Sequence, residues 1–458
     1  MIRASIYYDK GTIVIAGGFP VPYASSDPRG ERQRAQAMYY RDTLEYLRRS
    51  EAEVEDHVMD PIPLPLVTAR TKLRSYQEQA LRRWIDAGKR GVVVLPTGAG
   101  KTLVAVKAIE TIGLSALVVV PTLDLMLQWK GVLEQELGLQ VGAIGGEYDD
   151  LRAVTVITYD SAYLRASELG NKFFLLIFDE CHHLPSEGYR QIAEMFASPY
   201  RLGLTATPER EDGLEKLLPT LIGGIVYRLS PDSLAGKYLS DYEITRVTVD
   251  LTPEERENYE RNEAIFRSYL KKKRIYSWGP NAFLRLIMLS NSDKEAREAL
   301  LARNRAMQIA FNSEAKLKAL EQILRDNPED KVIIFTQYND LVYEISRRFL
   351  IPFITYKTSD EERDAVLKGF KEGTYKAIVA SKVLDEGVDV PEASLGVILS
   401  GSGSRREFVQ RLGRLLRKRE GKVARLIEIV SGGTSEVRVS ARRKRADGTR
   451  DWGQEEGI

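Results

Sequence analysis

The sequence is poor in cysteine and histidine: its 458 residues include one cysteine, Cys181, and three histidines. A single thiol cannot form an internal disulfide, and with only His57 outside the pair next to Cys181 no convincing zinc set exists. Long apolar runs are also missing, since residues 173–178 form a run of six and a membrane helix needs about 20. The N-terminus lacks the basic-then-apolar layout of a signal peptide. These absences exclude disulfide-rich, membrane and secreted proteins, and we expect a cytoplasmic protein.

An excess of charge of one sign is missing as well. The 67 basic and 65 acidic residues leave a net charge of +2, so any polyanionic partner must be met by local patches. Hydrophobic residues make up 43% of the chain, which is ample for several buried cores and excludes a disordered protein. The length corresponds to about three domains of ~150 residues.

The first part of the chain mixes strand and helix patterns. Short β-type runs surround a turn at residues 9–11, and a charged helical pattern covers about 31–49. Three prolines then mark residues 59–67 as a linker, because proline fits neither a helix interior nor a central strand.

Short apolar runs then alternate with helical patterns in two long stretches, and one such pattern predicts a helix at 123–137. This alternation predicts α/β lobes, each with a parallel sheet covered on both faces. The segment between the stretches is helix-rich after one strand expected at 243–251, and Thr252-Pro253-Glu254-Glu255 is a helix start. The predicted parts are a small N-terminal α+β domain (1–68), a first lobe (69–233), a helical insertion (234–311), a second lobe (312–439) and a basic polar tail (440–458).

A glycine-rich run follows an apolar strand pattern and opens a helix; it reads Leu95-Pro96-Thr97-Gly98-Ala99-Gly100-Lys101-Thr102. Gly98 and Gly100 let backbone N–H groups wrap a phosphate, Lys101 adds a full positive charge, and Thr102 offers a hydroxyl to Mg²⁺. Leu95 stands where the usual phosphate loop has its first glycine, so the strict pattern is not met. The alternative is an ordinary strand-to-helix turn, which the Lys-Thr pair disfavours. This loop is therefore expected to bind the phosphates of a nucleoside triphosphate together with Mg²⁺.

Two carboxylates follow the apolar run at 173–178. Asp179 at the strand end is placed to hold Mg²⁺ through water, and Glu180 beside it can act as the general base that activates the attacking water. The alternative is that these acidic residues only cap a helix. The presence of the phosphate loop in the same chain disfavours it.

Gln410, Arg414 and Arg417 share one face of a helix, because positions i, i+4 and i+7 stack. Guanidinium groups are planar and permanently charged, so Arg414 and Arg417 can stabilise a γ-phosphate from the second lobe. A solvated basic face is the alternative for this helix taken alone.

These residues resemble superfamily 2 helicases over nearly all of residues 73–430, which implies two RecA-like lobes with ATP between them. The resemblance is carried by Leu73-Arg74-Ser75-Tyr76-Gln77, Thr205-Ala206-Thr207-Pro208 and Gln410-Arg411-Leu412-Gly413-Arg414-Leu415-Leu416-Arg417, among other motifs. It implies that Gln77 reads adenine with Arg74 beside it, and that Thr205 and Thr207 link hydrolysis to the contact between the lobes. It implies nucleotide contacts through Gly387 and Asp389. It implies DNA contact or coupling through Thr122, Thr158, His183, Thr336, Ser381 and Lys382.

Within this superfamily, Asp179-Glu180-Cys181-His182-His183, the triplet Arg210-Glu211-Asp212 and the helical insertion together resemble the XPB family of DNA repair and transcription helicases, in its short archaeal or bacterial form. The resemblance implies that Arg210, Glu211 and Asp212 help to open duplex DNA. It implies that the insertion is a thumb and that residues 1–68 sense distorted DNA. It also implies 3′ to 5′ polarity and a nuclease or a larger repair or transcription assembly as partner.

Basic patches offer contacts to DNA. Lys271, Lys272 and Lys273 precede Arg274 and a Tyr-x-Trp pair, and basic with aromatic residues suit phosphate contact plus base stacking. A solvated helix face is an equally good interpretation. Residues 401–458 carry 15 basic and 8 acidic residues, but for the run at 442–445 a disordered tail is the preferred interpretation.

The leading prediction is an ATP-dependent DNA helicase or translocase that opens duplex DNA. One alternative is a nucleic-acid-binding adaptor that uses ATP only as a structural ligand; the intact Lys101, Asp179 and Glu180 argue against it. Another is an RNA helicase, which the triplet at 210–212 disfavours, or a restriction-type motor, which the lack of a nuclease carboxylate–lysine cluster weakens. ATP turnover with and without DNA separates motor from adaptor.

Overall fold

The computed structural model describes residues 3–17, 20–27, 30, 32–210, 212–230, 233–234, 242–275, 280–381, 393–400, 424–437, 440 and 456–457. The chain divides into two compact units, Met1–Leu234 and Ala235–Ile458. Among the described residues, no helix is both long and apolar enough to cross a membrane.

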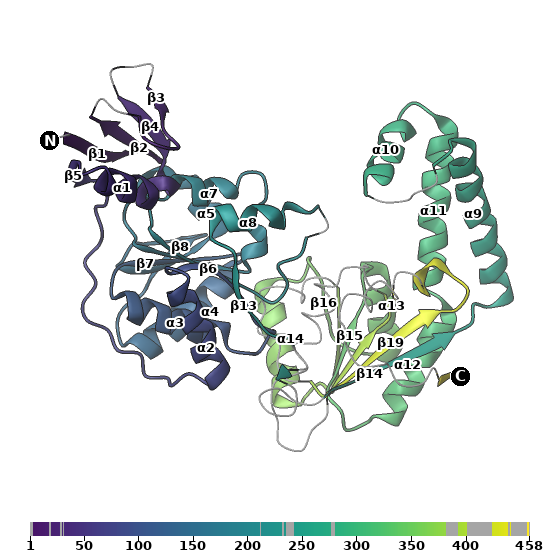
Figure 1. Ribbon diagram of the computed structural model, residues 1–458. Coiled ribbons are helices and arrows are strands. Elements are labelled where there is room, and N and C mark those ends of the chain that lie inside the picture. The colour runs from purple at the N-terminus through teal and green to yellow at the C-terminus, as the bar shows by residue number, and fades with distance from the viewer. Residues whose placement is uncertain are drawn as a thin grey trace. The chain divides into compact units, whose positions relative to one another are not determined.

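The N-terminal domain is a five-stranded sheet with one helix (Figure 1). The strand order is β3-β4-β2-β1-β5, with β1 (Arg3–Asp9), β2 (Thr12–Ala16), β3 (Ser25–Ser26), β4 (Gln33–Gln36) and β5 (Glu53–His57), and α1 covers Tyr40–Arg49. As predicted, β1 and β2 pair as a hairpin around the turn at 9–11. The helix predicted from about residue 31 begins only at Tyr40, because residues 33–36 pair antiparallel with β2.

The first lobe holds an eight-stranded sheet in the order β13-β6-β12-β11-β7-β10-β8-β9, in which every pair is parallel except β8–β9. Its strands are β6 (Arg90–Val94), β7 (Ala116–Val120), β8 (Gly142–Gly145), β9 (Tyr148–Asp150), β10 (Val154–Thr158), β11 (Leu175–Asp179), β12 (Tyr200–Thr205) and β13 (Ile225–Arg228). Helices cover both faces: α2 (Ser75–Asp86), α3 (Lys101–Ile112) and α4 (Leu123–Leu137) on one, α5 (Tyr159–Leu164), α7 (Arg190–Met195) and α8 (Leu218–Leu221) on the other (Figure 1). The short helix α6 (Ala166–Leu169) follows α5. The predicted helix at 123–137 is confirmed, and it ends at Gly138, whose φ of 68° stops it.

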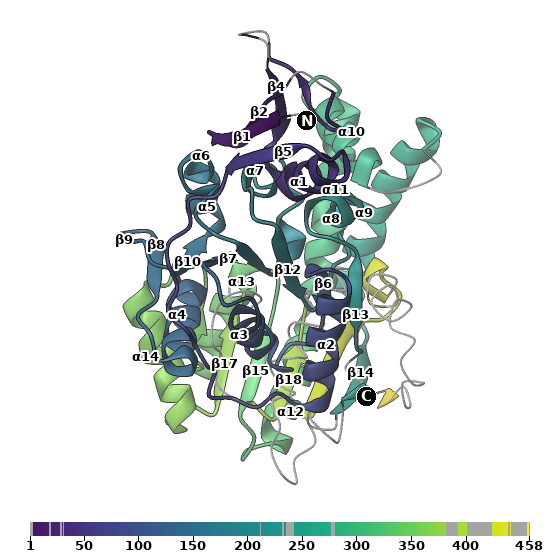
Figure 2. The same cartoon turned by 60° about the vertical axis from the view of Figure 1, so that its left-hand side comes forward.

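The N-terminal domain packs on the first lobe, against α6 and α7 (Figure 2). The Tyr8 hydroxyl lies 3.2 Å from the backbone oxygen of Met195, and burial raises the pKa of this phenol to about 12. Gly11 and Gly170 permit the close approach, since a Cβ on Gly11 would lie 2.6 Å from the Met195 side chain and one on Gly170 would lie 2.1 Å from the Tyr8 hydroxyl. Ala197 of the lobe belongs to the hydrophobic core of the N-terminal domain.

The second unit contains the helical insertion and the second lobe. Its parallel sheet has the order β16-β17-β15-β18-β19-β14-β20. The strands are β14 (Tyr242–Val249), β15 (Val332–Phe335), β16 (Phe353–Ile354), β17 (Ala377–Ala380), β18 (Leu395–Ile398), β19 (Ala424–Ser431) and β20 (Glu456–Gly457). The helices are α9 (Pro253–Lys272), α10 (Pro280–Ser290), α11 (Lys294–Phe311), α12 (Glu314–Asp326), α13 (Asn339–Phe349) and α14 (Asp360–Glu372). Both lobes are therefore α/β with parallel sheets, as predicted.

In the insertion, α9 and α11 lie side by side and α10 packs on them through a core that includes Phe266, Tyr269 and Leu286 (Figure 1). Helix α9 begins as predicted, with the Thr252 side chain accepting from the backbone N–H of Glu255 in a capping box. The strand expected at 243–251 does not belong to the insertion, because β14 pairs along its whole length with β19 of the second-lobe sheet.

Candidate functional site

The loop after β6 has the conformation that a phosphate-binding loop needs. Gly98 and Gly100 have φ values of 79° and 74°, which residues with a Cβ adopt only with strain. Gly100 also caps α3, and a Cβ there would lie 2.4 Å from Gln77 Nε2. Lys101 and Thr102 follow at the start of α3, where the first backbone N–H groups have no partner within the helix. The loop and the helix start therefore form a cradle for an anion.

Gln77 braces this loop from α2. Its Nε2 donates to the backbone oxygens of Ala99 at 2.9 Å and Gly100 at 3.2 Å, and its Oε1 accepts from the backbone N–H of Arg74 at 2.9 Å. The Tyr76 hydroxyl donates to the same Ala99 oxygen at 2.8 Å. Bracing the loop is a role that the sequence did not reveal, and adenine recognition by Gln77 and Arg74 stays a prediction.

Lys101 faces the two predicted acidic residues. Its Nζ lies 3.7 Å from Glu180 Oε1, with the two side chains 11% and 15% exposed. Asp179 accepts from the Trp129 indole N–H at 2.8 Å and from the backbone N–H of Glu180 at 3.1 Å. Burial and the neighbouring Glu180 charge raise the pKa of Asp179 to about 6, against the opposite pull of Lys101 and Trp129. A divalent cation would favour the charged form of this buried carboxylate, so the residues fit Mg²⁺.

The backbone of Glu180 is left-handed, with φ 44° and ψ 53°. Such a conformation costs a non-glycine residue about 1–3 kcal/mol and is concentrated at functional sites. The backbone N–H of His183 donates to the Glu180 carbonyl oxygen at 3.0 Å, which closes the short turn Cys181–His183 behind it. This backbone conformation is a property that sequence patterns do not report.

Thr205 joins the end of β12 to Glu180. Its hydroxyl donates to Glu180 Oε2 at 3.2 Å, lies 3.0 Å from His182 Nδ1, and accepts from the backbone N–H of Thr207 at 3.1 Å. The predicted motif residues Thr205 and Thr207 therefore lie together with the predicted base. The fully buried histidine of this cluster is His182, and the His183 ring packs against the Tyr159 ring at 5.9 Å between centroids. Coupling through His183 stays a prediction.

Two buried hydroxyls at this site, Thr97 Oγ1 and Thr207 Oγ1, have no hydrogen-bond partner among the described residues. An unpaired buried polar group costs about 1–3 kcal/mol, which a phosphate oxygen or a metal-bound water could offset. Together with the glycine cradle, these hydroxyls fit a nucleoside triphosphate.

The charged triplet contacts the turn that follows Glu180. Arg210 forms a bidentate pair with Asp212 at 2.6 and 2.8 Å, and it donates to the backbone oxygen of His182 and to Ser186 Oγ. The bond with Arg210 lowers the pKa of Asp212 to about 2. Glu211 lies outside the described residues. Arg210 is therefore bonded to the Cys181–His183 turn of the candidate ATPase site, a link that the sequence did not reveal.

The residues predicted to contact DNA lie at strand ends or on the insertion. Thr122 and Thr158 cap α4 and α5 at the ends of the neighbouring strands β7 and β10. Thr336 and Ser381 are buried at the ends of β15 and β17, and the Thr336 hydroxyl lies 2.7 Å from Ser400 Oγ. Contact with DNA stays a prediction for all four.

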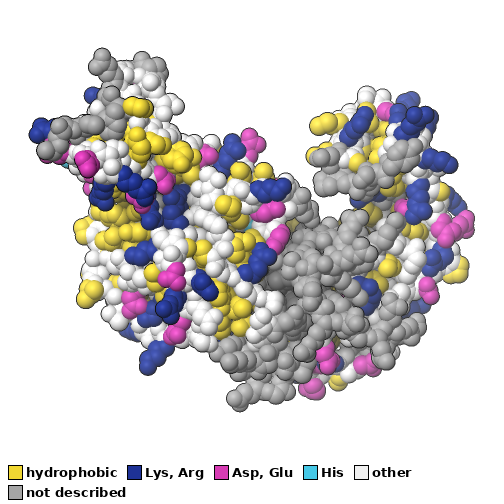
Figure 3. Space-filling model, in the orientation of Figure 1, with side chains coloured by type: hydrophobic (Ala, Val, Ile, Leu, Met, Phe, Trp, Pro, Cys, Tyr) yellow, Lys and Arg dark blue, Asp and Glu magenta, His cyan; other side chains and the backbone are white. Residues whose placement is uncertain are grey.

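The lysine run is partly neutralised within the insertion. Lys272 pairs with Glu295 at 2.7 Å and Lys273 with Asp293 at 3.2 Å. Figure 3 shows basic and acidic side chains interspersed along the outer edge of the insertion. These pairs favour the interpretation of a solvated face, although they leave phosphate contact by Lys271 open.

Several predicted residues lie outside the described part of the chain: Lys382, Gly387, Asp389, Gln410, Arg414 and Arg417.

Family models match three parts of the chain. The model described as "Xeroderma pigmentosum group B helicase damage recognition domain" matches residues 6–58, "Type III restriction enzyme, res subunit" matches 70–210, and "Helicase conserved C-terminal domain" matches 315–419.

Curated relatives cover most of the chain. It is 50% identical to the "DNA 3'-5' translocase XPB2" of Sulfurisphaera tokodaii over 90% of this chain and 93% of that protein. It is 31% identical to the "DNA 3'-5' helicase XPB" of Mycobacterium tuberculosis over 84% of this chain and 65% of the relative. The zebrafish "General transcription and DNA repair factor IIH helicase/translocase subunit XPB" is 28% identical, and the chain spans 50% of it.

Among solved structures, the Pyrococcus furiosus Hef helicase domain superposes with a TM-score of 0.56 at 22% identity, covering 81% of this chain and 98% of that one. This likeness shows the fold, two RecA-like helicase lobes.

Proposed function

Since this chain belongs to the XPB family of DNA 3'-5' helicases and translocases, it is a DNA-dependent ATPase, and we propose that the cluster around Lys101 and Glu180 is where it hydrolyses ATP. The energy of hydrolysis moves the protein along DNA and opens the duplex in repair or transcription. The cytoplasmic location remains a prediction.

The observation that carries the proposal is the convergence of Lys101, Asp179, Glu180 and Thr205 at the carboxyl ends of β6, β11 and β12. Ligands bind at this edge of parallel α/β sheets, because helix N-termini and strand-end loops gather there. The hydroxyls of Thr97 and Thr207, which have no partner among the residues that the structure describes, give a triphosphate further hydrogen bonds to make.

The proposed roles follow from this geometry. The loop 95–102 wraps the phosphates, and Lys101 neutralises their charge. Glu180 accepts a proton from the water that attacks the γ-phosphorus, while Thr205 fixes the orientation of the Glu180 carboxylate. Thr102 and Asp179 would hold Mg²⁺, which supplies charge for the phosphate oxygens.

The remaining roles rest on family membership. We propose that Gln410, Arg414 and Arg417 complete the site from the second lobe, and that Gly387 and Asp389 also contact the nucleotide. DNA contact is proposed for the strand ends and the insertion. The zebrafish relative is named as a subunit of factor IIH. For this chain, a nuclease or a repair or transcription assembly is proposed as partner.

The test is ATP turnover with single-stranded, duplex and forked DNA and with RNA, for the unmodified protein and for Glu180→Gln. We expect DNA to stimulate turnover more than RNA and the variant to lose turnover while it still binds ATP. A turnover indifferent to every nucleic acid would contradict the motor, binding of ATP without any turnover would favour the adaptor, and stimulation by RNA alone would favour an RNA helicase.

A further inference from the structure

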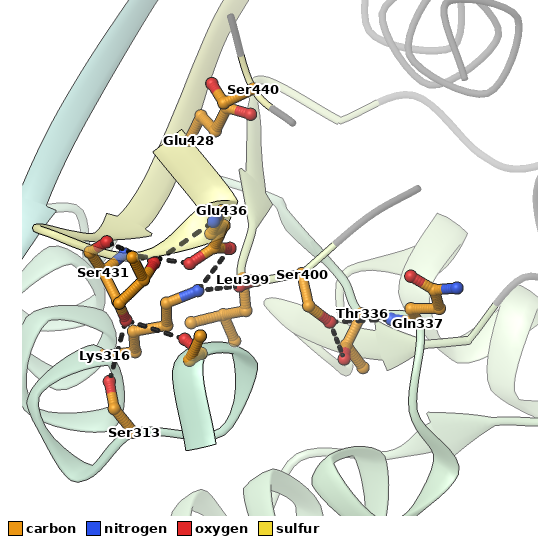
Figure 4. A network of polar contacts seen from close by, with 12 residues as sticks. Ser313, Lys316, Thr336, Gln337, Leu399, Ser400, Glu428, Ser431, Glu436 and Ser440 are labelled. Carbon is orange, nitrogen blue, oxygen red and sulfur yellow. Dashed lines mark hydrogen bonds and ion pairs between the residues drawn. The ribbon is translucent and has the colours of Figure 1, made fainter. Parts of the chain in front are cut away.

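A buried lysine lies at the base of the insertion, at the carboxyl edge of the second-lobe sheet (Figure 4). Lys316, on α12, donates through Nζ to Glu436 Oε1 at 2.6 Å and to the backbone oxygen of Leu399 at 2.7 Å. Leu399 directly follows β18, and Glu436 lies in the helical turn at 435–437 that follows β19. One ammonium group therefore joins a helix, a strand end and the turn after a second strand.

The contacts of Glu436 and its turn extend to both long helices of the insertion. Glu436 Oε2 accepts from the backbone N–H of Ser431 at 2.9 Å, and the Ser431 hydroxyl donates to the backbone oxygen of Ala310 on α11 at 2.7 Å (Figure 4). On α9, the Tyr259 hydroxyl oxygen accepts from the backbone N–H of Ser435 at 2.7 Å. The turn after β19 is thus bonded to α9, α11 and α12.

On the other side, the contact with Leu399 leads to the strand ends that we expect to meet DNA. Ser400 Oγ lies 2.7 Å from Thr336 Oγ1 and accepts from the backbone N–H of Gln337 at 2.9 Å (Figure 4). The backbone that Lys316 holds therefore carries the hydroxyl that braces the end of β15.

Stability alone does not account for a pair buried to this degree. Both side chains are almost fully buried, at 1% and 4% exposure, and burial raises the pKa of Glu436 against the pull of Lys316. Replacing a buried ion pair by well-packed hydrophobic residues of similar volume is often neutral or stabilising, since desolvation offsets the attraction. What the pair does provide is fixed spacing between three backbone segments.

We propose that Lys316 and Glu436 are positioning residues that hold the base of the insertion in register with the ends of β18 and β15, so that DNA bound by the insertion stimulates ATP hydrolysis. The inference rests on the proposed function, because it requires turnover that DNA stimulates.

The test uses a double variant, Lys316→Met with Glu436→Gln, which removes both charges at similar volume and keeps an amide oxygen for the Ser431 N–H. The matched control is Arg246→Met with Glu428→Gln. That buried pair, 3.2 Å apart, joins β14 and β19 within the same sheet. For each protein we would measure the ratio of ATP turnover with saturating forked DNA to turnover without it, the DNA concentration for half-saturation, and the melting temperature.

We expect the Lys316/Glu436 variant to lose about fivefold or more of the DNA stimulation ratio, the lower end of typical coupling factors. Its turnover without DNA and its half-saturating DNA concentration should stay near those of the parent, and the control should keep the parent ratio. A folded Lys316/Glu436 variant with the parent ratio overturns the proposal, and so does an equal loss in the control.

If the double variant does not fold, Tyr259→Phe provides a second test of the positioning role. It removes one hydroxyl from the turn's contact with α9 and should lower the ratio by about two- to threefold, as single changes along a coupling route do. An unchanged ratio there overturns the proposal. Absence of DNA stimulation in the unmodified protein would instead contradict the proposed function itself.

Discussion

Each lobe carries a lysine–glutamate pair at the carboxyl edge of its parallel sheet, and the two pairs differ in separation, in exposure and in their hydrogen bonds. Lys101 and Glu180 lie 3.7 Å apart and are 11% and 15% exposed, whereas Lys316 and Glu436 lie 2.6 Å apart and are 1% and 4% exposed. The first pair belongs to a site with two buried hydroxyls, of Thr97 and Thr207, that find no hydrogen-bond partner in the described part of the chain. In the second pair, Lys316 bonds both to Glu436 and to a backbone oxygen, and Glu436 also accepts a backbone N–H.

The difference separates a pair that is ready for a ligand from one that is satisfied within the protein. At 3.7 Å the lysine makes no strong hydrogen bond with its glutamate, so its charge is available to a phosphate. At 2.6 Å, out of water and with further hydrogen bonds, the pair fixes geometry.

The largest expected effect is on chemistry at the first pair. Glu180→Gln should reduce ATP turnover by about 10²- to 10⁴-fold, the usual contribution of a general base, while ATP binding persists. Lys101→Ala should abolish turnover because it also removes the charge that binds phosphate. Steady-state turnover and binding of a fluorescent ATP analogue distinguish these outcomes. Parental turnover in Glu180→Gln would show that another group is the base.

The next effect is on stability, and it falls on the second pair. Lys316→Met alone leaves Glu436 buried without its ammonium partner, which should cost about 3–5 kcal/mol of unfolding free energy. Lys101→Ala should cost far less, because its partner Glu180 keeps its contact with Thr205. Denaturant unfolding of both variants checks the contrast. Equal losses would mean that the two pairs do not differ in the way described.

A smaller effect is expected at Arg210, which bonds to the turn behind Glu180. Arg210→Ala should lower ATP turnover by about tenfold, as expected for loss of a charge-assisted hydrogen bond of ~1.5 kcal/mol. Asp212→Asn keeps the Arg210 guanidinium and its bond to the His182 backbone oxygen but removes the partner charge, and it serves as the control. Strand separation on a forked duplex, measured on the same preparations, should fall at least as far as turnover. Unchanged turnover in Arg210→Ala, with strand separation lost, would assign the triplet to duplex opening alone.

The smallest effect concerns the lysine run on the insertion. DNA affinity plotted against salt on logarithmic axes changes slope by about 0.9 for each duplex phosphate neutralised. Because Lys272 and Lys273 are already paired with acidic residues, substitution of Lys271, Lys272 and Lys273 by glutamine should change the slope by about one phosphate rather than three. An unchanged slope would make the run a solvated face.

The sequence revealed local features of the site and missed those that arise from contacts between distant residues. The glycines, the Lys-Thr pair and the position after a strand identified the loop at 95–102. Helical periodicity predicted both ends of α4. The contact of His182 with Thr205 is one of the missed features, because the conformation of the Cys181–His183 turn decides which ring faces Thr205. No pattern pointed to Lys316 and Glu436, since they lie 120 positions apart and each resembles an ordinary surface residue.

The strand β14 shows the same limit at the level of the fold. The residues of β14 predicted a strand correctly. No local pattern indicated that this strand would pair with β19, far along the chain, and so belong to the second lobe rather than to the insertion that follows it. The charged pattern over about 31–49 likewise predicted one helix, but residues 33–36 pair with β2 and form a strand instead.

The packing of the N-terminal domain on the first lobe limits how easily this domain could be transferred to another protein. Ala197 of the first lobe belongs to the hydrophobic core of this domain. Gly11 leaves room for Met195, and Gly170 leaves room for Tyr8. Each side of the boundary therefore packs on residues that the other side supplies. A gene rearrangement that moved residues 3–57 to another motor would carry an open core with it and leave bare carbonyl oxygens behind. We therefore expect that a substitution on one side of this boundary is tolerated best when the facing residue on α6, α7 or the segment after them changes with it.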